Sequence, residues 1–116
     1  MITNIKINIS QWDIVHVDLG ALDGSSLQKG LRPCVVVSNN MSCRCSPVIQ
    51  VVPLTTRPKR HLPTHTTITT AKISSTFLGE QILSIQCNTQ LRERIGTLSA
   101  GEIEAAKNCL RIQLAM

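Results

Sequence analysis

Apolar and polar residues alternate along residues 13–19, where Val15, Val17 and Leu19 share one face of the segment. A period of two is typical of a β-strand with one buried face. Residues 34–38 differ, because Val35–Val37 form a continuous β-branched run that indicates a buried strand. A long polar loop with three glycines, at 20, 24 and 30, separates the two strands. A loop of this length in a small domain is often functional.

The remaining pattern predicts short strands followed by one helix. Strands are expected over 48–54 and 66–70, and a strand region over 76–85 is expected to break near Gly79. Residues 39–47 are rich in turn formers, and 91–95 is predicted to form a short helical turn. Residues 1–11 are a polar lead-in that we expect to be loosely held.

A capping box predicts the last helix. Ser99 caps the helix and Glu102 reaches back to it, so the helix is expected from Ala100 to about Leu114. Its apolar stripe consists of Ile103, Ala106, Leu110 and Leu114. The whole pattern predicts one α+β domain over 1–116, a small, strongly bent antiparallel sheet or barrel with an appended C-terminal helix.

The junction between the long loop and the second strand carries candidate chemistry. Pro33 cannot donate to a strand ladder, so we expect it at the first position of the strand. Arg32 is then extended and lies where the loop meets the sheet. A guanidinium fixed there suits a phosphate group. An ordinary surface arginine at the mouth of a strand fits the same pattern, and the residues alone leave both interpretations open.

Composition narrows the partners and the compartment. The formal net charge of +5 favours an acidic partner, either nucleic acid or an acidic protein. Aromatic residues make up only 2% of the chain, which argues against binding single strands mainly by base stacking. The 116 residues contain no apolar run long enough to span a membrane and begin with no signal-peptide pattern, so a cytosolic protein without membrane attachment is expected.

The cysteines and histidines give little support to a metal site. The five cysteines are an odd number without a disulfide framework, which suits reduced thiols. Cys43 and Cys45 are too close together for most metal pairs, and no matching histidine pair follows. We therefore predict no metal and no other cofactor.

Four motifs in register resemble the MazF/PemK/Kid toxin family. The first is Asp13–Leu19 followed by Ser26-x-Gln28-x-Gly30-x-Arg32-Pro33 and Val35–Asn39. The second is Ser46-Pro47 with Val51–Thr55, and the third is Leu62-Pro63-Thr64-His65. The last is Glu80-Gln81-Ile82 with Ile95-Gly96-x-Leu98, and together the four cover about residues 12–115.

The resemblance implies an SH3-like barrel, a homodimer, and a metal-independent endoribonuclease that is silenced by a cognate MazE-like antitoxin. Such toxins cleave single-stranded RNA, including mRNA, at short sequences and generally leave a 2′,3′-cyclic phosphate and a 5′-hydroxyl. By the same resemblance Arg32 and Thr55 are the catalytic residues. The implied RNA-binding residues are Ser26, Gln28, Thr56, Arg57, Lys59, Leu62, His65, Ser75, Glu80 and Gln81.

The residue types are compatible with these roles. Arginine stays protonated at neutral pH, so Arg32 suits an electrostatic clamp better than a general base. Histidine is the usual general base, which leaves open whether His65 or Arg32 takes the proton. His16, in the first strand, is expected to be structural. Glu80 and Gln81 suit base edges, since a carboxylate accepts from exocyclic amines.

The chain departs from the family pattern at a few positions, and two other functions compete. Trp12 stands where glycine is usual, Leu27 replaces a common acidic residue, and Leu83 replaces a common arginine. One alternative is a toxin that binds gyrase, like CcdB, and the other is a catalytically silent protein that only binds the antitoxin. The intact Arg32 and Thr55 argue against the silent protein, and the Arg32-Pro33 and Leu62–His65 motifs argue against the gyrase binder.

Overall fold

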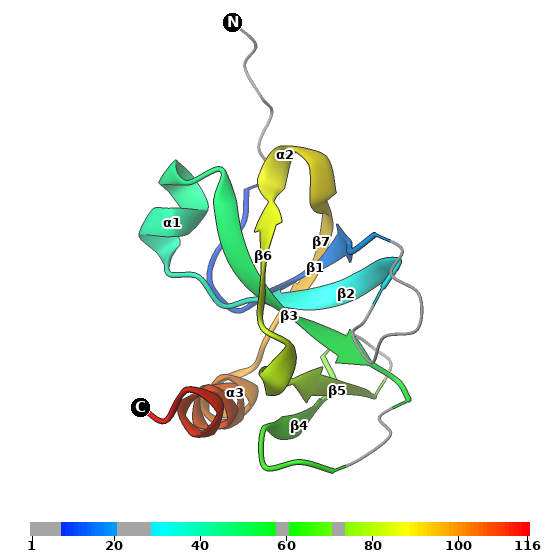
Figure 1. Ribbon diagram of the computed structural model, residues 1–116, viewed down its shortest axis with the longest axis vertical. Coiled ribbons are helices and arrows are strands. Elements are labelled where there is room, and N and C mark those ends of the chain that lie inside the picture. Colours follow the sequence, from blue (N-terminus) through cyan, green and yellow to red (C-terminus); the bar gives the residue numbers. More distant parts are fainter. Residues whose placement is uncertain (1–7, 21–28, 58–60, 71–73) are drawn as a thin grey trace, which may run out of the picture.

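A computed structural model describes residues 8–20, 29–57, 61–70 and 74–116, and this part of the chain forms one bent antiparallel sheet with helices at its ends (Figure 1). The sheet has seven strands in the order β4-β5-β3-β2-β1-β7, and β6 also pairs with β3. The strands are β1 (Asp13–Asp18), β2 (Leu31–Val36), β3 (Val48–Thr55), β4 (His65–Ile68), β5 (Ser75–Leu78), β6 (Leu83–Gln86) and β7 (Leu91–Thr97). The helices are α1 (Asn40–Cys45), the 3-10 turn η1 (Gly79–Gln81), α2 (Cys87–Gln90) and α3 (Ala100–Leu114).

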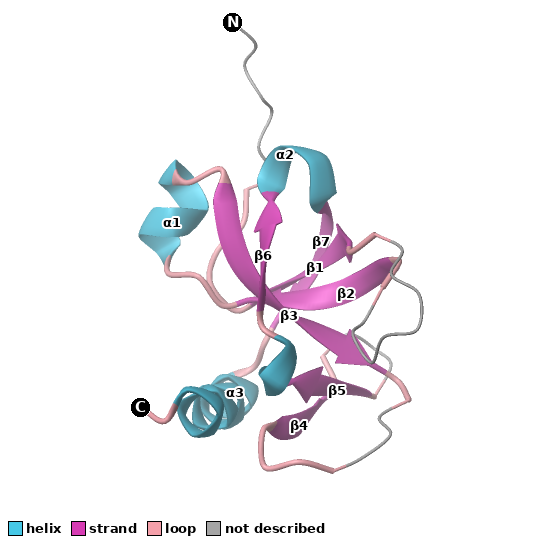
Figure 2. Ribbon diagram, viewed as in Figure 1, coloured by secondary structure: helices cyan, strands magenta, loops and turns pink. Residues whose placement is uncertain are grey.

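Strand β3 connects the two parts of the sheet. Its first half pairs with β6, its middle pairs with β2, and its last two residues pair with β5. Because the partners change along β3, the sheet bends there, and β4 and β5 lie beside α3 at one end of the molecule (Figure 2).

Both faces of the central strands are buried. Neighbouring residues such as Ile14 and Val15, or Val35 and Val36, belong to two different apolar clusters. One cluster lies among β1, β2, β3 and β6, and the other includes Phe77 of β5 and Ala106 of α3. Burial on both faces explains why β2 and β3 contain continuous apolar runs instead of a strict alternation.

The predicted fold class is confirmed: a bent antiparallel sheet with a C-terminal helix. The capping box is present as expected, and α3 covers Ala100–Leu114. The predicted stripe is buried at Ala106, but Leu114 at its end is 48% exposed. None of the helices in the described ranges is long and apolar enough to cross a membrane.

The prediction for Pro33 was wrong. Strand β2 begins at Leu31, so Pro33 is its third residue and pairs with His16 of β1. Pairing with β3 starts only at Cys34. The missing N–H of Pro33 is tolerated because the β3 side of the ladder has not yet begun there.

Three other segments also differ from expectation. Residues 40–45 form a helix instead of turns, since the Asn39 side chain accepts from the Ser42 N–H and Cys43 packs into the core. Residues 91–97 form strand β7 instead of a helical turn, because they pair with the otherwise open edge of β1. The strand expected over 66–70 runs from His65 to Ile68.

The lead-in expected to be loose is anchored where the structure describes it. Ile9 is 6% exposed within the core, and the Gln11 amide donates to the Val37 carbonyl at 3.0 Å. The backbone N–H of Ser10 donates to the Asp13 carboxylate at 2.8 Å. Residues 1–7 of this expected lead-in lie outside the described residues.

Candidate nucleic-acid interface

The two predicted catalytic residues lie at the same end of neighbouring antiparallel strands. Arg32 is the second residue of β2, and Thr55 is the last residue of β3. The start of β2 and the end of β3 lie on the same side of the molecule (Figure 1). The described pairing of β2 with β3 ends at Cys34↔Pro53, two residues short of both Arg32 and Thr55, and β3 then pairs with β5. Arg32 and Thr55 therefore both lie at this end of the two strands.

The backbone beside Arg32 is fixed by a hydrogen bond between the two ends of the preceding loop. The Leu19 N–H donates to the Gly30 carbonyl at 2.9 Å, and Gly30 has a φ of +77° that suits glycine. The Nε of Arg32 donates to the Lys29 carbonyl at 2.9 Å. Among the described residues, no carboxylate forms an ion pair with this guanidinium, so its Nη groups are the ones available for a phosphate.

Thr55 is held at the point where β3 ends. Thr55 is only 7% exposed, and its backbone pairs with Thr76 of β5. The Thr55 hydroxyl oxygen accepts from the Arg57 N–H at 3.2 Å. A hydroxyl carries one hydrogen as well as its lone pairs. Thr55 can therefore accept from its own loop and donate its hydrogen outward.

The Leu62-Pro63-Thr64-His65 motif forms a tight turn into β4. The His65 N–H donates to the Leu62 carbonyl at 2.9 Å, and the Leu62 N–H donates to His65 Nδ1 at 3.4 Å. The His65 side chain is only 6% exposed. Its other ring nitrogen, Nε2, lies 3.0 Å from Glu80 Oε2. Both ring nitrogens of His65 therefore have partners inside the protein.

Glu80 receives hydrogen bonds on both carboxylate oxygens. The Thr64 hydroxyl donates to Oε1 at 2.9 Å, and His65 bonds Oε2. Burial acts to raise the pKa of Glu80, but the bonds from His65, from its own backbone and from Thr64 lower that pKa below its usual value. Glu80 is therefore an ionised carboxylate at neutral pH, and its side chain is 27% exposed.

The other predicted RNA-binding residues differ in exposure. Thr56, Arg57 and Leu62 are exposed, Gln81 is partly buried, and Ser75 is 4% exposed within β5. Ser26, Gln28 and Lys59 lie outside the described residues. His16, which was expected to be structural, lies in β1 with Nδ1 3.4 Å from Glu93.

Thr64 was not singled out from the sequence, although it is buried and contacts Glu80 directly. The Leu-Pro-Thr-His motif contained the necessary signal, since its third residue has the only side-chain hydroxyl in that turn. Thr64 and Glu80 lie 16 positions apart in the sequence, and only the β4–β5 hairpin brings them together, so the contact itself could not be read from the sequence.

The described residues contain no group of three or more histidine, cysteine, aspartate or glutamate side chains that could hold a metal ion. All five cysteines are free thiols. Burial raises the pKa of Cys34 to about 12, so this thiol is a poor nucleophile near neutral pH.

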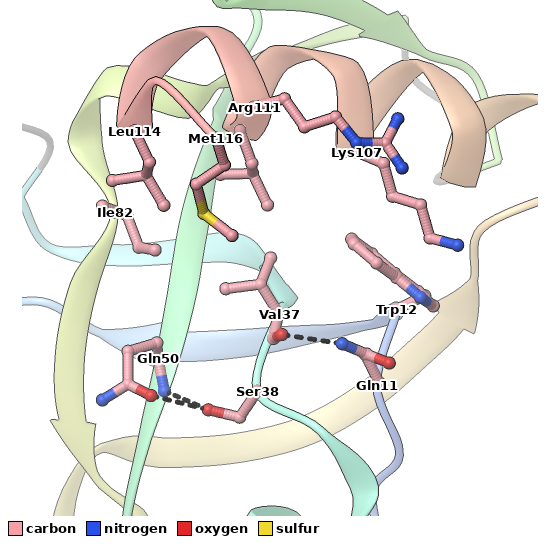
Figure 3. Close-up of a pocket in the computed structure, with 11 residues that line it drawn as sticks. Gln11, Trp12, Val37, Ser38, Gln50, Ile82, Lys107, Arg111, Leu114 and Met116 are labelled. Carbon is pink, nitrogen blue, oxygen red and sulfur yellow. Dashed lines mark hydrogen bonds between the residues drawn. The ribbon is translucent and has the colours of Figure 1, made fainter.

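A cavity of about 400 Å³ lies away from this edge, between α3 and the sheet (Figure 3). Its apolar lining is Trp12, Val37, Ile82, Leu110, Leu114 and Met116, and its polar lining is Gln11, Ser38, Gln50, Lys107 and Arg111. Two of the polar groups bond one another: the Ser38 hydroxyl donates to Gln50 Oε1 at 2.9 Å. The Gln11 amide donates to the Val37 carbonyl, so the Gln11, Ser38 and Gln50 side chains in the cavity lining already have hydrogen-bond partners.

Comparisons with known proteins identify a family that the sequence matches. Residues 10–114 match the family model described as the PemK-like, MazF-like toxin of type II toxin–antitoxin systems. The chain is 32% identical over 109 residues to the Endoribonuclease MazF of Staphylococcus saprophyticus, covering 90% of this chain and 89% of that protein.

Solved structures match the fold. A mycobacterial endoribonuclease in complex with its cognate antitoxin aligns with a TM-score of 0.79 at 20% identity, over 94% of this chain and 97% of that one. MazF from Deinococcus radiodurans aligns with a TM-score of 0.78 at 20% identity, over 93% of this chain and 97% of that one. The predicted SH3-like barrel of this type is thereby confirmed.

Proposed function

Because this chain belongs to the PemK-like, MazF-like family of toxins of type II toxin–antitoxin systems, we propose that it is an endoribonuclease that cleaves single-stranded RNA such as mRNA. The observation that carries this proposal is the position of Arg32 and Thr55, together at the edge where β2 begins and β3 ends. The presence of both Arg32 and Thr55 argues against a catalytically silent antitoxin binder, and the Arg32-Pro33 and Leu62–His65 motifs argue against a gyrase-binding toxin.

The proposed reaction uses a nucleophile of the RNA itself. The 2′-hydroxyl loses its proton and attacks the adjacent phosphorus, and the bond from phosphorus to the 5′ oxygen breaks. The leaving oxygen takes up a proton, which gives a 2′,3′-cyclic phosphate and a 5′-hydroxyl. The protein must therefore stabilise added charge on the phosphate and move protons at both oxygens.

Arg32 and Thr55 suit the first of these tasks. The Nη groups of Arg32 offer a planar pair of donors for two phosphate oxygens. The Thr55 hydroxyl offers one more donor, fixed by its bond from the Arg57 N–H. Donors held in place before the reaction stabilise the transition state without reorganisation.

Recognition of the RNA is proposed to use the rim around this edge. Thr56 and Arg57 are exposed directly after Thr55, Leu62 is exposed in the turn before β4, and Arg57 supplies a positive charge for the RNA backbone. Ser26, Gln28, Ser75, Gln81 and Lys59 are kept as proposed RNA contacts, Glu80 is proposed to read a base edge, and the buried His65 is proposed to act in RNA binding through its bond to Glu80.

The partner of the toxin is proposed to be a MazE-like antitoxin with an acidic segment. Such a segment would compete with RNA for Arg32, Arg57 and Lys59, since all three carry positive charge. The mycobacterial relative was solved with its cognate antitoxin, which supports a partner of this kind. Both the toxin and its RNA targets are expected in the cytosol.

A homodimer is also proposed, and the face around the α3 cavity is its best candidate interface. Leu114 is 48% exposed and Met116 is 85% exposed at the rim of this cavity. Because the Gln11, Ser38 and Gln50 side chains have partners, covering this face leaves few polar groups unsatisfied. A second copy would bury the exposed apolar side chains and lengthen the RNA-binding surface.

The direct test is incubation of the purified protein with a long mixed-sequence RNA in excess EDTA. We expect cleavage at short recurring sequences, with cyclic phosphate at the upstream ends, because the part of the chain that the structure describes holds no cluster of ligands for a catalytic metal. Loss of cleavage in EDTA with recovery on addition of magnesium or zinc would contradict the metal-free mechanism. Absence of cleavage with and without metal, combined with gyrase binding, would favour the other toxin class.

A further inference from the structure

The contacts around Glu80 separate the role of His65 from that of a direct RNA ligand. The His65 side chain is 6% exposed, whereas that of Glu80 is 27% exposed. Glu80 is therefore the more solvent-accessible of the two side chains, and His65 is the more buried one. A residue in this inner position reaches a bound RNA only through its neighbour.

The hydrogen-bond directions fix the form of the His65 ring. The Leu62 N–H can only donate, so Nδ1 must accept that bond and carries no hydrogen. In the neutral ring the hydrogen is then on Nε2, 3.0 Å from Glu80 Oε2. His65 therefore donates a hydrogen bond to Glu80 through Nε2 and accepts one from the Leu62 N–H through Nδ1.

Thr64 completes the support of the carboxylate. Its hydroxyl donates to Oε1 at 2.9 Å, so each oxygen of Glu80 is held by one donor from the turn before β4. A carboxylate has about four lone-pair positions, and the bonds from Thr64, from His65 and from the backbone of Glu80 itself leave about one for the exocyclic amine of a base.

The backbone beneath this group is also locked. The Gly79 N–H donates to the Thr64 carbonyl at 3.0 Å. A Cβ at Gly79 would lie 2.7 Å from the same carbonyl oxygen, so only glycine fits without a shift. The turn before β4 and the 3-10 turn η1 therefore form one rigid unit with Glu80 on its outer side.

We propose that His65 is a positioning residue that, with Thr64, holds the Glu80 carboxylate for recognition of an amino group on an RNA base. This inference rests on the proposed function. It makes Glu80 the specificity-determining residue of the site and removes His65 from the candidates for general base.

The test compares variants by cleavage-site preference, KM and kcat on a mixed-sequence RNA. His65→Leu removes the donor, while His65→Gln places an amide N–H near the former Nε2. We expect His65→Leu to raise KM about fivefold to tenfold at the preferred sequence, with a smaller change in kcat. It should relax the same base position as Glu80→Gln, and His65→Gln should restore most of the preference.

A double variant separates positioning from direct action. In a Glu80→Gln background, His65→Leu should change cleavage by less than about twofold, because the two residues act as one unit. A loss of kcat as large in that background as in the wild type would overturn the proposal and assign His65 a role of its own.

Two controls keep the result interpretable. Thr64→Val removes the second donor without touching His65, and it should relax the same base position, which keeps the proposal testable if His65→Leu does not fold. Glu104→Gln removes a carboxylate on α3 whose side chain is 71% exposed and pairs with Lys107, and it should leave the preference unchanged. A wild-type protein that cleaves no RNA would contradict the proposed function itself, independently of these variants.

Discussion

Arg32 differs from the arginines of β7 in what surrounds its guanidinium. Arg94 pairs with Asp13 at 3.2 Å, and Arg92 pairs with Asp18 at 3.6 Å. Arg32 has only a backbone carbonyl as a described hydrogen-bond partner, through Nε. An arginine whose charge is not neutralised by a carboxylate is the one suited to an incoming phosphate.

Replacing Arg32 by lysine tests this assignment. Arg32→Lys keeps the charge but loses the planar pair of donors, so cleavage should fall at least about tenfold while RNA affinity falls less. The measurement is single-turnover cleavage beside an RNA-binding titration. Arg92→Lys, on exposed β7, is the matched control and should retain activity. Full activity of Arg32→Lys would exclude Arg32 as the catalytic clamp.

Glu102 is the carboxylate with the largest described pKa shift. Burial acts to raise its pKa, but bonds from the Thr70 hydroxyl and from the Ser99 and Thr69 backbone lower it to about 2. Because the folded pKa lies below the ordinary value of 4.5, ionised Glu102 stabilises the folded state above that pH. This contribution is lost as the pH falls from 4.5 toward about 2.

The variant Glu102→Gln should therefore have a lower melting temperature than the wild type at pH 7. The difference should shrink on acidification below the ordinary carboxyl pKa, since Glu102 of the unfolded wild-type chain then takes up a proton while the folded protein still holds it ionised. Thermal unfolding followed by circular dichroism between pH 7 and pH 3 measures it. Glu104→Gln is the control, and an equal, pH-independent loss in both variants would refute the assignment.

At the scale of elements, Trp12 has the most unusual backbone. Its φ is +74°, in the left-handed region, immediately before β1. The family pattern has glycine at this position, which adopts that conformation without a steric cost. Trp12 keeps the strained backbone while its indole packs against the second apolar cluster and lines the α3 cavity.

Two substitutions separate the strain from the packing. Trp12→Ala and Trp12→Gly both remove the indole, but only glycine relieves the left-handed backbone, so Trp12→Gly should be more stable by about 1 kcal/mol. Urea unfolding measures the difference. Asn108 within α3 provides the opposite control, because Asn108→Gly should be less stable than Asn108→Ala by about 1 kcal/mol. Equal stabilities of the two Trp12 variants would contradict the strain.

The elements that the sequence predicted well are those with a local signal. The alternation of β1 and the capping box of α3 are both read from neighbouring residues. Strand β7 was missed because its exposed residues at 92–95 are fixed by pairing with β1, about 80 positions earlier in the chain. Helix α1 was missed because its six residues depend on one cap and one buried cysteine.

In the candidate site, too, only features marked by a local sequence motif could be predicted. Arg32 and Thr55 were chosen by the motifs that resemble the family, and their placement at one edge agrees with that choice. The bond between His65 and Glu80 was not predictable, because the β4–β5 hairpin must form before the two residues meet.

At the scale of the whole molecule, three exposed apolar residues lie close together in sequence at the end of the chain. Ile112 is 47% exposed, Leu114 is 48% exposed and Met116 is 85% exposed. Leu114 and Met116 also line the α3 cavity with Trp12 (Figure 3). An exposed apolar patch beside a cavity is typical of a protein–protein interface.

We therefore expect a dimer at micromolar concentrations, joined through this face. Leu114→Asp would place a charge in the interface, and because Leu114 is already 48% exposed, the fold of each copy should be little affected. Sedimentation should give a dimer for the wild type and a monomer for Leu114→Asp. Met41→Asp, at a residue 62% exposed on α1, is the matched control and should stay dimeric. A monomeric wild type would reject the dimer, whereas a dimeric Leu114→Asp would place the interface on another face.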